Sequence, residues 1–518
     1  MPSELSVRPF KRQPMRSIHW FIALPSLLSA QVPAEFTAAR RTIDSLIAAH
    51  RLPSVAVAVA RDGRVVWETA FGLADREKNI AATPQTAYSL ASISKPFTAT
   101  GLMKLVEKGR VALERPLNDY LGPAKLRAFE GKAPNATVQH VLTHTAGLPL
   151  HYQFFYRDGG YPVPTTDETI RRFGILTYRP GGGYQYSNLG FGLLDYVIRR
   201  QSGLSYGDYM RREVFDPLGL THTSVGPRAG LEAETAVRYT NDDQPIPYYT
   251  FDHPGASEVY ASAHDLVRFG MFHLGNAVEG QQAVLSASTR ARMQRDAAVE
   301  GPGATRGLGW AIRADEFGHR RISHTGGMPG VSTMLAMYPE ANVVVVVLLN
   351  KALPQVMSRI AQELAAAVLP GYDVRLREAL ARPASAPSAA DWTSLVGRWR
   401  GYVRSYADSI PVEFTVAHTG PHDVRVGAVT VGNAEGTTWV NGVFSMTTPS
   451  PLTAPDIKRQ PHLLSFVLRP RGDTLSGYAA AVSGPPQAPR AFYALSSYAR
   501  VVKERVARPS TLPRRGAP

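Results

Sequence analysis

The sequence predicts an α/β fold of the α+β kind, an antiparallel sheet flanked by helices, followed by an all-β, barrel-like C-terminal domain. Up to about residue 370, apolar runs typical of buried strands alternate with longer stretches of helical periodicity. From residue 391 on, short alternating runs follow one another, separated by turns that contain Gly, Asn and Asp. A segment rich in Pro, Ala and Ser (382–390) lies between these regions and is typical of a linker.

Length and composition limit the classes of protein to which the chain can belong. A chain of 518 residues can form two or three domains, and 44% hydrophobic with 19% charged residues is typical of globular proteins. The absence of cysteine excludes disulfides, thiolate metal sites and cysteine nucleophiles. Lys and Arg (57) outnumber Asp and Glu (42), which gives a net charge of +15. Because the basic residues form no dense run beside aromatic residues, we expect no nucleic-acid partner, whereas peripheral association with an anionic cell envelope stays open.

The N-terminus is typical of a secretory signal. An apolar run over 18–30, ending in small residues, follows three basic residues, Lys11, Arg12 and Arg16. We therefore expect residues 1–34 to be a signal peptide, cleaved after Ala30 or Ala34, and the mature protein to be secreted or periplasmic. The run is short for a membrane anchor, and no later stretch reaches about 18 apolar residues.

For residues 35–372 the patterns predict one domain of helices and paired strands. A helix over 36–50 precedes a buried strand at 54–60, a turn, and a returning strand at 64–71. The stretch 94–108 has an apolar face and ends at Gly109, so we expect a buried central helix. Further along, we expect a helix at 189–200, strands at 318–323, 331–338 and 342–350, and a helix at 354–368. The strands from the two ends of this region should share one antiparallel sheet.

Ser92 and Lys95 form the first candidate catalytic motif. They are three residues apart at the start of the predicted helix, so their side chains lie on one face. A lysine amine beside a serine hydroxyl can take its proton and make it a nucleophile, and the positive end of the helix favours the developing charge. An S-x-x-K motif alone occurs by chance in a chain of this length, so the later motifs decide its significance.

Two later motifs carry groups of matching chemistry. The stretch 186–188 follows a turn of three glycines; Tyr186 can act as a general base, and Asn188 can hold the lysine and a substrate oxygen. The third motif follows the predicted strand 318–323 and consists of His324, Thr325, Gly326 and Gly327.

Three other features allow a functional interpretation, and each has a structural alternative. Ser205 lies in a G-x-S-x-G pattern that requires a strand before it, whereas a helix is predicted there. His140 and His144 have the i, i+4 spacing of metal ligands, but no glutamate lies between them, so we favour a structural role and expect no metal site. The aromatic residues of 150–180 fit a lid or substrate wall, or a small core beneath a long loop, about equally well.

The all-β domain is predicted at 391–503, after a linker at 373–390 and before a basic tail at 504–518 that we expect to be disordered. The expected strands are 397–403, 411–417, 423–431, 438–444, 463–468, 475–482 and 491–495. They predict a small barrel or sandwich without a catalytic cluster.

Taken together, the three motifs resemble those of the penicillin-recognising serine hydrolases. The resemblance is to the class C β-lactamase-related branch, with family VIII esterases, D-aminopeptidases and DD-carboxypeptidase-like proteins. Side signatures also match, at 141–148, 216–219, 262–266, 307–310 and 349–350. The resemblance covers residues 36–370 and implies a β-lactamase/transpeptidase-like fold with an all-α subdomain. The C-terminal domain resembles, less closely, the lipocalin-like domain of some members.

By this resemblance, the protein hydrolyses a small-molecule ester, or a peptide of the D-amino-acid or cell-wall type, without a cofactor. An acyl-enzyme forms on Ser92, and Lys95 and Tyr186 share the roles of general base and acid. Backbone N–H groups of Ser92 and Gly327 form the oxyanion hole. The other residues of the substrate site are Asn188, His324, Thr325 and Gly326.

One position departs from the family pattern. β-Lactamases and many carboxypeptidases of this group carry lysine where His324 stands, and no lysine occurs between Lys132 and Lys351. A neutral imidazole binds a carboxylate less firmly than an ammonium does. We therefore expect an esterase or a peptidase acting on a less anionic substrate rather than an efficient β-lactamase. The alternative is a non-hydrolytic, penicillin-binding-like sensor or scaffold that binds cell-wall peptide; the oligomeric state stays open.

Overall fold

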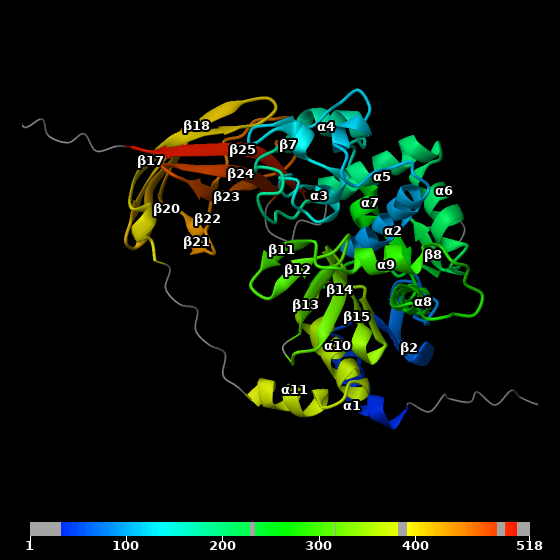
Figure 1. The fold of residues 1–518 in the computed structure, drawn as a ribbon. Coiled ribbons are helices and arrows are strands. Elements are labelled where there is room, and N and C mark those ends of the chain that lie inside the picture. The colour runs from blue at the N-terminus through cyan, green and yellow to red at the C-terminus, as the bar shows by residue number, and fades with distance from the viewer. Residues whose placement is uncertain (1–32, 228–233, 316, 382–390, 484–492, 505–518) are drawn as a thin grey trace, which may run out of the picture.

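The computed structural model describes residues 33–227, 234–315, 317–381, 391–483 and 493–504. The elements up to α11 form an N-terminal part in which a large sheet lies among helices, and the elements from β17 on form a C-terminal sheet (Figure 1). Nearly all of the predicted signal peptide and basic tail lie outside the described residues. Among the described residues, no helix is both long and apolar enough to cross a membrane.

In the described chain, nine strands of the N-terminal part form one antiparallel sheet in the order β11-β12-β13-β14-β15-β16-β1-β2-β3. They are β1 (Ser54–Arg61), β2 (Arg64–Asp75), β3 (Ile80–Ala81), β11 (Ala298–Gly301), β12 (Ala304–Arg306), β13 (Ala311–Ala314), β14 (Arg320–Met328), β15 (Val331–Tyr338) and β16 (Val343–Leu349). The prediction that strands from both ends of this region share a sheet is confirmed, because β1 pairs with both β2 and β16.

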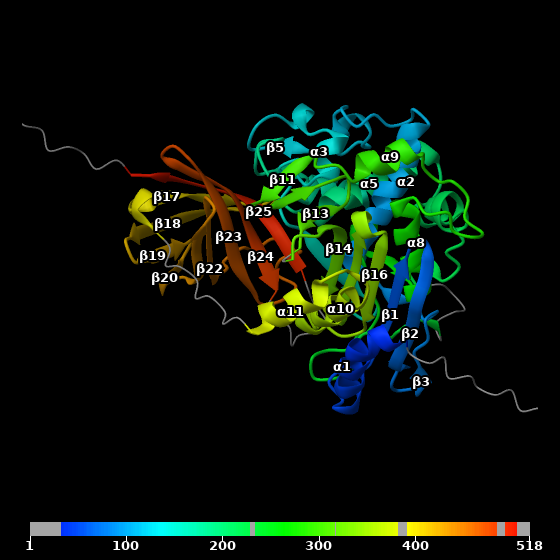
Figure 2. The same ribbon diagram turned by 60° about the horizontal axis from the view of Figure 1, so that its bottom comes forward.

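The side chains of β1 alternate between two apolar layers, because successive residues of a strand point to opposite faces. Val55 and Val57 pack in the cluster that contains α1 (Thr37–Ala48) and α10 (Pro354–Val368). Ala56 and Ala58 face the other layer, which contains α2 (Ser94–Glu107) and α8 (Ala263–Leu274) (Figure 2). A strand covered on both faces must be apolar at every position, which explains the continuous apolar run in the sequence.

Further helices and short strands complete the N-terminal part. The helices are η1 (Ala34–Phe36), η2 (Ala91–Ile93), η3 (Leu117–Asp119), η4 (Ala133–Asn135), α3 (Val138–Leu142), α4 (Thr166–Phe173), α5 (Asn188–Ser202), α6 (Tyr206–Met210), η5 (Arg211–Phe215), α7 (Pro254–Ser257), α9 (Ala287–Met293), η7 (Pro339–Ala341) and α11 (Tyr372–Ala381). Two small sheets consist of β4 (Tyr88–Ser89), β10 (Val259–Ala261) and β8 (Thr223–Val225), and of β5 (Arg127–Ala128) and β7 (Ile175–Leu176). The predicted central helix is confirmed, since α2 is buried along most of its length.

The C-terminal sheet is antiparallel and curls into a half-barrel. Its described strands follow the order β20-β19-β18-β17-β25-β24-β23-β22-β21. They are β17 (Gly397–Arg404), β18 (Ser409–Ala417), β19 (Gly420–Val426), β20 (Val429–Asn433), β21 (Glu435–Val440), β22 (Val443–Pro449), β23 (His462–Arg471), β24 (Thr474–Ser483) and β25 (Tyr493–Lys503), preceded by η8 (Thr393–Leu395). Only Ala434 separates β20 from β21, yet they form opposite ends of the sheet, and no pairing joins them in the described residues.

Two of the predicted C-terminal strands are wrong, because each contains a hairpin turn. The stretch 423–431 includes the turn at Gly427, which has φ of 58° and joins β19 to β20. The stretch 438–444 includes Asn441 and Gly442, with φ of 51° and 71°, which join β21 to β22. Asn-Gly favours a two-residue hairpin turn because both residues accept positive φ.

The segment predicted as a linker is partly helical. Helix α11 occupies 372–381, so only the residues after it remain for a connection, and 382–390 lie outside the described residues.

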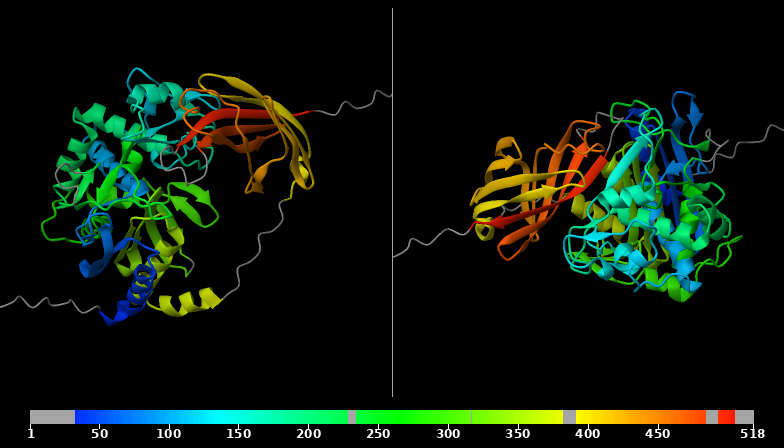
Figure 3. Two further views of the ribbon diagram at one scale, coloured as in Figure 1. Left: turned by 180° about the vertical axis from the view of Figure 1, so that it is seen from behind. Right: turned by 90° about the horizontal axis from the view of Figure 1, so that it is seen from above.

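Strand β6 (Tyr152–Tyr156) connects the two parts of the molecule. Its first two residues pair with β25, and its last three pair with β9 (Tyr249–Phe251). Phe154 and Tyr156 also pack with Tyr249 in a small apolar cluster, so this aromatic stretch forms a satellite core. Figure 3 shows the two parts side by side, from behind and from above.

Candidate active site

Ser92 lies in the short helix η2, where the chain turns into α2. The residue before it, Ala91, has φ of 48°, a left-handed conformation that costs free energy for a residue with a side chain. Such a turn presents the Ser92 hydroxyl at the helix start, beside the side chain of Lys95 one turn on. The distance from Lys95 Nζ to Ser92 Oγ is 3.0 Å.

The Lys95 amine is fully buried and fixed by two carbonyl oxygens. It donates to Asn188 Oδ1 at 2.8 Å, at the start of α5, and to Ala256 O at 3.1 Å, in α7. Burial, and next the positive charge of Arg306, hold the pKa of Lys95 well below its ordinary value. This shift favours the neutral form of the amine.

Tyr186 completes the contacts of the Ser92 hydroxyl. Its phenol donates to Ser92 Oγ at 3.0 Å, and burial raises the pKa of Tyr186 to about 12. Ser187 caps α5 by accepting from Gly190 N, which orients the loop that carries Tyr186. The ring of His144 stacks on Tyr186 with a centroid distance of 4.4 Å, and His144 Nδ1 accepts from Ser187 N.

The motif 324–327 lies within β14 rather than after a strand. His324 is buried, while Thr325 and Gly327 are exposed on the alternate positions. His324 Nδ1 lies 2.8 Å from Thr325 O; because a carbonyl accepts, Nδ1 carries the proton, and Nε2 has no partner among the described residues. Burial, and also the positive charge of Arg306, keeps the pKa of His324 well below its ordinary value, so the ring is neutral.

Gly326 lets β14 pass close to the turn that carries Ser92. A Cβ at this position would overlap the backbone oxygen of Leu90 and the hydroxyl of Thr333. That hydroxyl donates to Leu90 O at 2.9 Å, so β15 also holds the turn. Gly327 is the next residue of β14, and a Cβ there would meet no atom within 4 Å. Its N–H therefore lies on the part of the strand that passes the turn carrying Ser92.

Two groups near the site were not predicted from the sequence to be part of it. Arg306 on β12 is buried, pairs with Glu300 at 3.0 Å and donates to Tyr184 Oη at 2.9 Å. Its charge influences the pKa of Lys95 and of His324, and no short-range pattern links β12 to η2. His144, interpreted as structural, contacts Tyr186; the only sequence signal was its place in the side signature 141–148.

The competing motifs lie elsewhere or form other structures. Ser205 caps α6 and bonds the carboxylate of Asp208 at 2.6 Å, directly after helix α5, so the nucleophile-elbow context is missing. His140 lies in α3, whereas His144 follows its end with φ of 57°, so the two rings do not share a helix face.

A cavity of about 580 Å³ adjoins the exposed side of β14. Thr325 and Gly327 line it together with apolar side chains, among them Ile246, Met328 and Met357. The cavity thus lies against the strand that carries the third motif, and Ser92 is not among the described residues that line it.

Comparison with known proteins places this arrangement in a family. The beta-lactamase family model matches residues 39–369. The chain belongs to the beta-lactamase family. This family of serine hydrolases includes esterases and β-lactamases, and the predicted β-lactamase/transpeptidase-like fold is confirmed.

Curated relatives of this β-lactamase family member carry different names. Penicillin-binding protein 4* of Bacillus subtilis (strain 168) is 26% identical over 375 residues, which cover 68% of this chain and 78% of the relative. Esterase EstB of Burkholderia gladioli is 29% identical over 327 residues, which cover 55% of this chain and 80% of the relative.

Solved structures agree with the fold. The octameric penicillin-binding protein homologue from Pyrococcus abyssi matches 90% of this chain and 99% of its own, with a TM-score of 0.56 and 22% identity. A class C beta-lactamase matches 66% of this chain and 99% of its own, with a TM-score of 0.55 and 21% identity.

Proposed function

We propose that the protein hydrolyses a small ester, or an amide of the D-amino-acid or cell-wall type, through an acyl-enzyme on Ser92. The observation that carries this proposal is the convergence of Lys95 Nζ and Tyr186 Oη, each 3.0 Å from Ser92 Oγ, in a partly buried site. Both groups lie within the range for direct proton transfer. The predicted signal peptide supports a secreted or periplasmic location for this activity.

The neutral amine of Lys95 is the proposed base. Its two N–H bonds are directed at Asn188 Oδ1 and Ala256 O, which leaves the lone pair for the Ser92 hydroxyl. The bond from Oγ to the carbonyl carbon forms while the serine proton moves to Nζ. N–H groups of Ser92 and Gly327 are the proposed donors to the resulting oxyanion.

Tyr186 is the proposed acid. As a phenol with a raised pKa, it can give its proton to the leaving oxygen or nitrogen as the bond to the carbonyl carbon breaks. The proton held on Lys95 then restores the phenol. In the second half of the reaction, water attacks the carbonyl carbon of the acyl-enzyme and Ser92 Oγ is the leaving group. The acid product is then released.

Neutral, weakly polar substrates fit the site best. His324 is neutral and its unprotonated Nε2 is buried, so the ring offers no positive charge to a substrate carboxylate. The apolar lining of the cavity along β14 suits an uncharged acyl or alcohol group that extends past Thr325 and Gly327. These two features favour an ester over a β-lactam, in keeping with the esterase among the relatives.

Intact-mass spectrometry tests the proposal with the native chain and Ser92→Ala. Each protein is incubated with a fluorophosphonate, a p-nitrophenyl ester and a penicillin, and ester turnover is followed by absorbance. We expect a fluorophosphonate adduct and turnover of the ester that are both lost in Ser92→Ala, with slow or no penicillin adduct.

Other outcomes select the alternatives. A stable penicillin adduct without ester turnover would favour the non-hydrolytic sensor that binds cell-wall peptide. No adduct on folded native protein would exclude Ser92 as a nucleophile.

A further inference from the structure

A buried charged group lies directly behind the catalytic lysine and Asn188. His151 Nε2 donates to Asp252 Oδ2 at 2.8 Å, and His253 Nδ1 donates to Asp252 Oδ1 at 2.6 Å. All three side chains are buried. The carbonyl oxygen of His151 accepts from Asn188 Nδ2 at 2.9 Å, so this group holds the amide whose other end holds Lys95.

Three such side chains could also bind a metal ion, since their ligand atoms lie within 4.8 Å of one another. Each histidine, however, already directs an N–H at an Asp252 oxygen, and the carboxylate uses both oxygens. Both oxygens of Asp252 are therefore satisfied by the two rings, whereas His151 Nδ1 and His253 Nε2 have no hydrogen-bond partner among the described residues; we interpret the group as a support for the site.

The C-terminal sheet reaches this group through Arg459, in the loop between β22 and β23. In the orientation of the Gln153 amide that satisfies both of its neighbours, its nitrogen donates to Asp252 Oδ2 at 3.2 Å and its oxygen accepts from Arg459 Nη2. Gln153 lies in β6, two residues after His151, and pairs with Tyr493 of β25. The guanidinium lies 5.6 Å from the ring centre of Tyr493 and 5.3 Å from that of Phe155.

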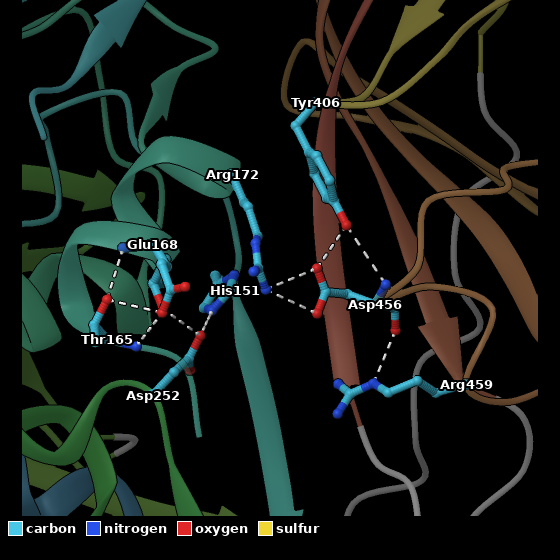
Figure 4. Close-up of polar contacts among 9 residues, drawn as sticks. His151, Thr165, Glu168, Arg172, Asp252, Tyr406, Asp456 and Arg459 are labelled. Atoms are coloured by element: carbon cyan, nitrogen blue, oxygen red, sulfur yellow. Dashed lines mark hydrogen bonds and ion pairs between the residues drawn. The ribbon is translucent and has the colours of Figure 1, made fainter. Parts of the chain in front are cut away.

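A second contact fixes the loop that carries Arg459. Asp456 accepts from Arg172 of α4 at 3.3 Å and from Tyr406 Oη at 2.6 Å, and Arg459 Nε donates to Asp456 O at 3.0 Å (Figure 4). Figure 4 shows Arg172 extending from α4 toward Asp456, with His151 and Asp252 behind it on the N-terminal side. The Arg172 contact docks the loop but makes no hydrogen bond to Asp252.

We propose that Arg459 of the C-terminal sheet is a positioning residue for the active site, acting through Gln153, Asp252 and His151 on Asn188 and Lys95. The proposal rests on the proposed function of Ser92 and Lys95. The route from Arg459 to the Ser92 hydroxyl consists of hydrogen bonds between buried or half-buried groups, except within His151, where its own side chain connects Asp252 to the carbonyl oxygen that accepts from Asn188. The C-terminal sheet thereby supports the catalytic lysine without touching the substrate.

Arg459→Met tests the proposal, with Arg459→Lys as the conservative variant and Arg172→Met as the matched control in the same interface. We expect Arg459→Met to lower kcat for the p-nitrophenyl ester at least about tenfold, with KM changed less than about twofold, because a small displacement of a catalytic group costs rate rather than binding. Arg459→Lys, which can still donate to Gln153, should recover part of kcat. Arg172→Met should change kcat less than about twofold.

A double-mutant cycle that combines Arg459→Met with Gln153→Met tests whether Arg459 acts on the active site through Gln153. Gln153→Met also provides a second variant. If Arg459 acts through Gln153, the double variant is no slower than the slower single variant, whereas independent effects would multiply. An unchanged kcat in folded Arg459→Met, or equal losses of kcat in Arg459→Met and Arg172→Met, would overturn this inference. Either outcome would leave the proposed function of Ser92 intact. A native chain without fluorophosphonate labelling would overturn the proposed function, and the inference with it.

Discussion

Two side chains with opposite pKa shifts contact one hydroxyl in this protein. Burial, and next Arg306, lowers the pKa of Lys95 well below its ordinary value, while burial raises the pKa of Tyr186 to about 12. Both shifts favour the neutral form. At the scale of single residues, one low-dielectric site therefore favours an unprotonated amine and a protonated phenol beside Ser92, as the proposed base and acid require.

The pH dependence of acylation should reflect these shifts. A base with a lowered pKa is deprotonated at lower pH, so the rate constant should rise with pH and reach its plateau well below the ordinary lysine value of 10.5. Tyr186 keeps its proton, so no alkaline fall is expected up to pH about 10. Stopped-flow labelling by a fluorophosphonate measures the profile. A decline between pH about 8 and 10, with the fold intact by circular dichroism, would contradict the assigned acid.

The identity of residue 324 should set the preference for charge. In His324→Lys, an ammonium could form a charge-assisted hydrogen bond with a substrate carboxylate, which contributes about 1.5–3 kcal/mol. We therefore expect acylation by a penicillin to rise about tenfold or more relative to a neutral ester. Intact-mass kinetics measure both rates. His140→Lys adds the same charge in α3 and should leave the ratio unchanged; an equal change in both variants would contradict a local effect.

The sequence predicted which residues surround Ser92 better than it predicted the charges and protonation states around them. Lys95, Tyr186 and Asn188 converge, because each is tied to a recognisable local motif. Arg306 is different, since it reaches the site only through the pairing of β12 within the large sheet. The fixed tautomer of His324 depends on a backbone oxygen, which no residue pattern reveals.

At the scale of elements, the site depends on the close approach of β14 to η2. Gly326→Ala should force these apart, because the added methyl overlaps Leu90 O and Thr333 Oγ1. Overpacking of this kind costs about 1–3 kcal/mol of the free energy of unfolding. Displacing the N–H of Gly327 should also lower kcat by about 10²–10³. Urea denaturation and ester kinetics measure the two effects.

The neighbouring glycine provides the control for this substitution. At Gly327 a Cβ meets nothing within 4 Å, so Gly327→Ala should keep the native free energy of unfolding. Equal losses of stability in Gly326→Ala and Gly327→Ala would show that the strand, rather than the contact with η2, is sensitive.

Most elements of the N-terminal part could be predicted, whereas the C-terminal turns could not all be located. Helix α10 and strand β16 match the periodicity closely, because long apolar patterns have few alternatives. In the C-terminal sheet, the apolar alternation continues through the turns at Gly427 and Asn441, so the runs predicted there merged two strands into one. In the structure, the positive φ of Gly427 and Asn441 marks the two turns that separate these strands.

At the scale of the whole molecule, the two parts share a continuous apolar core. One buried cluster includes side chains of the N-terminal helices and of the C-terminal sheet. Phe173 meets Tyr406 edge to face at 5.6 Å, and Phe129 stacks on Tyr498 at 4.5 Å. This shared core could not be predicted from residue patterns, because the pairing of β6 with β25 joins residues more than 300 positions apart.

The chain should therefore unfold in one transition. We expect differential scanning calorimetry to give a single peak, with calorimetric and van't Hoff enthalpies in agreement, as for a single cooperative unit. Two peaks separated by about 10 °C or more would show that the parts are stable independently.

The order of the C-terminal strands has a consequence for synthesis on the ribosome. Strand β25 lies between β17 and β24 in the sheet, although it is the last of them to be translated. Until it emerges, the two halves of the sheet have no common partner, their edges are open, and β6 lacks its neighbour. Nascent chains would thus depend on protection of those edges, and enzymatic activity would report that translation has passed residue 503.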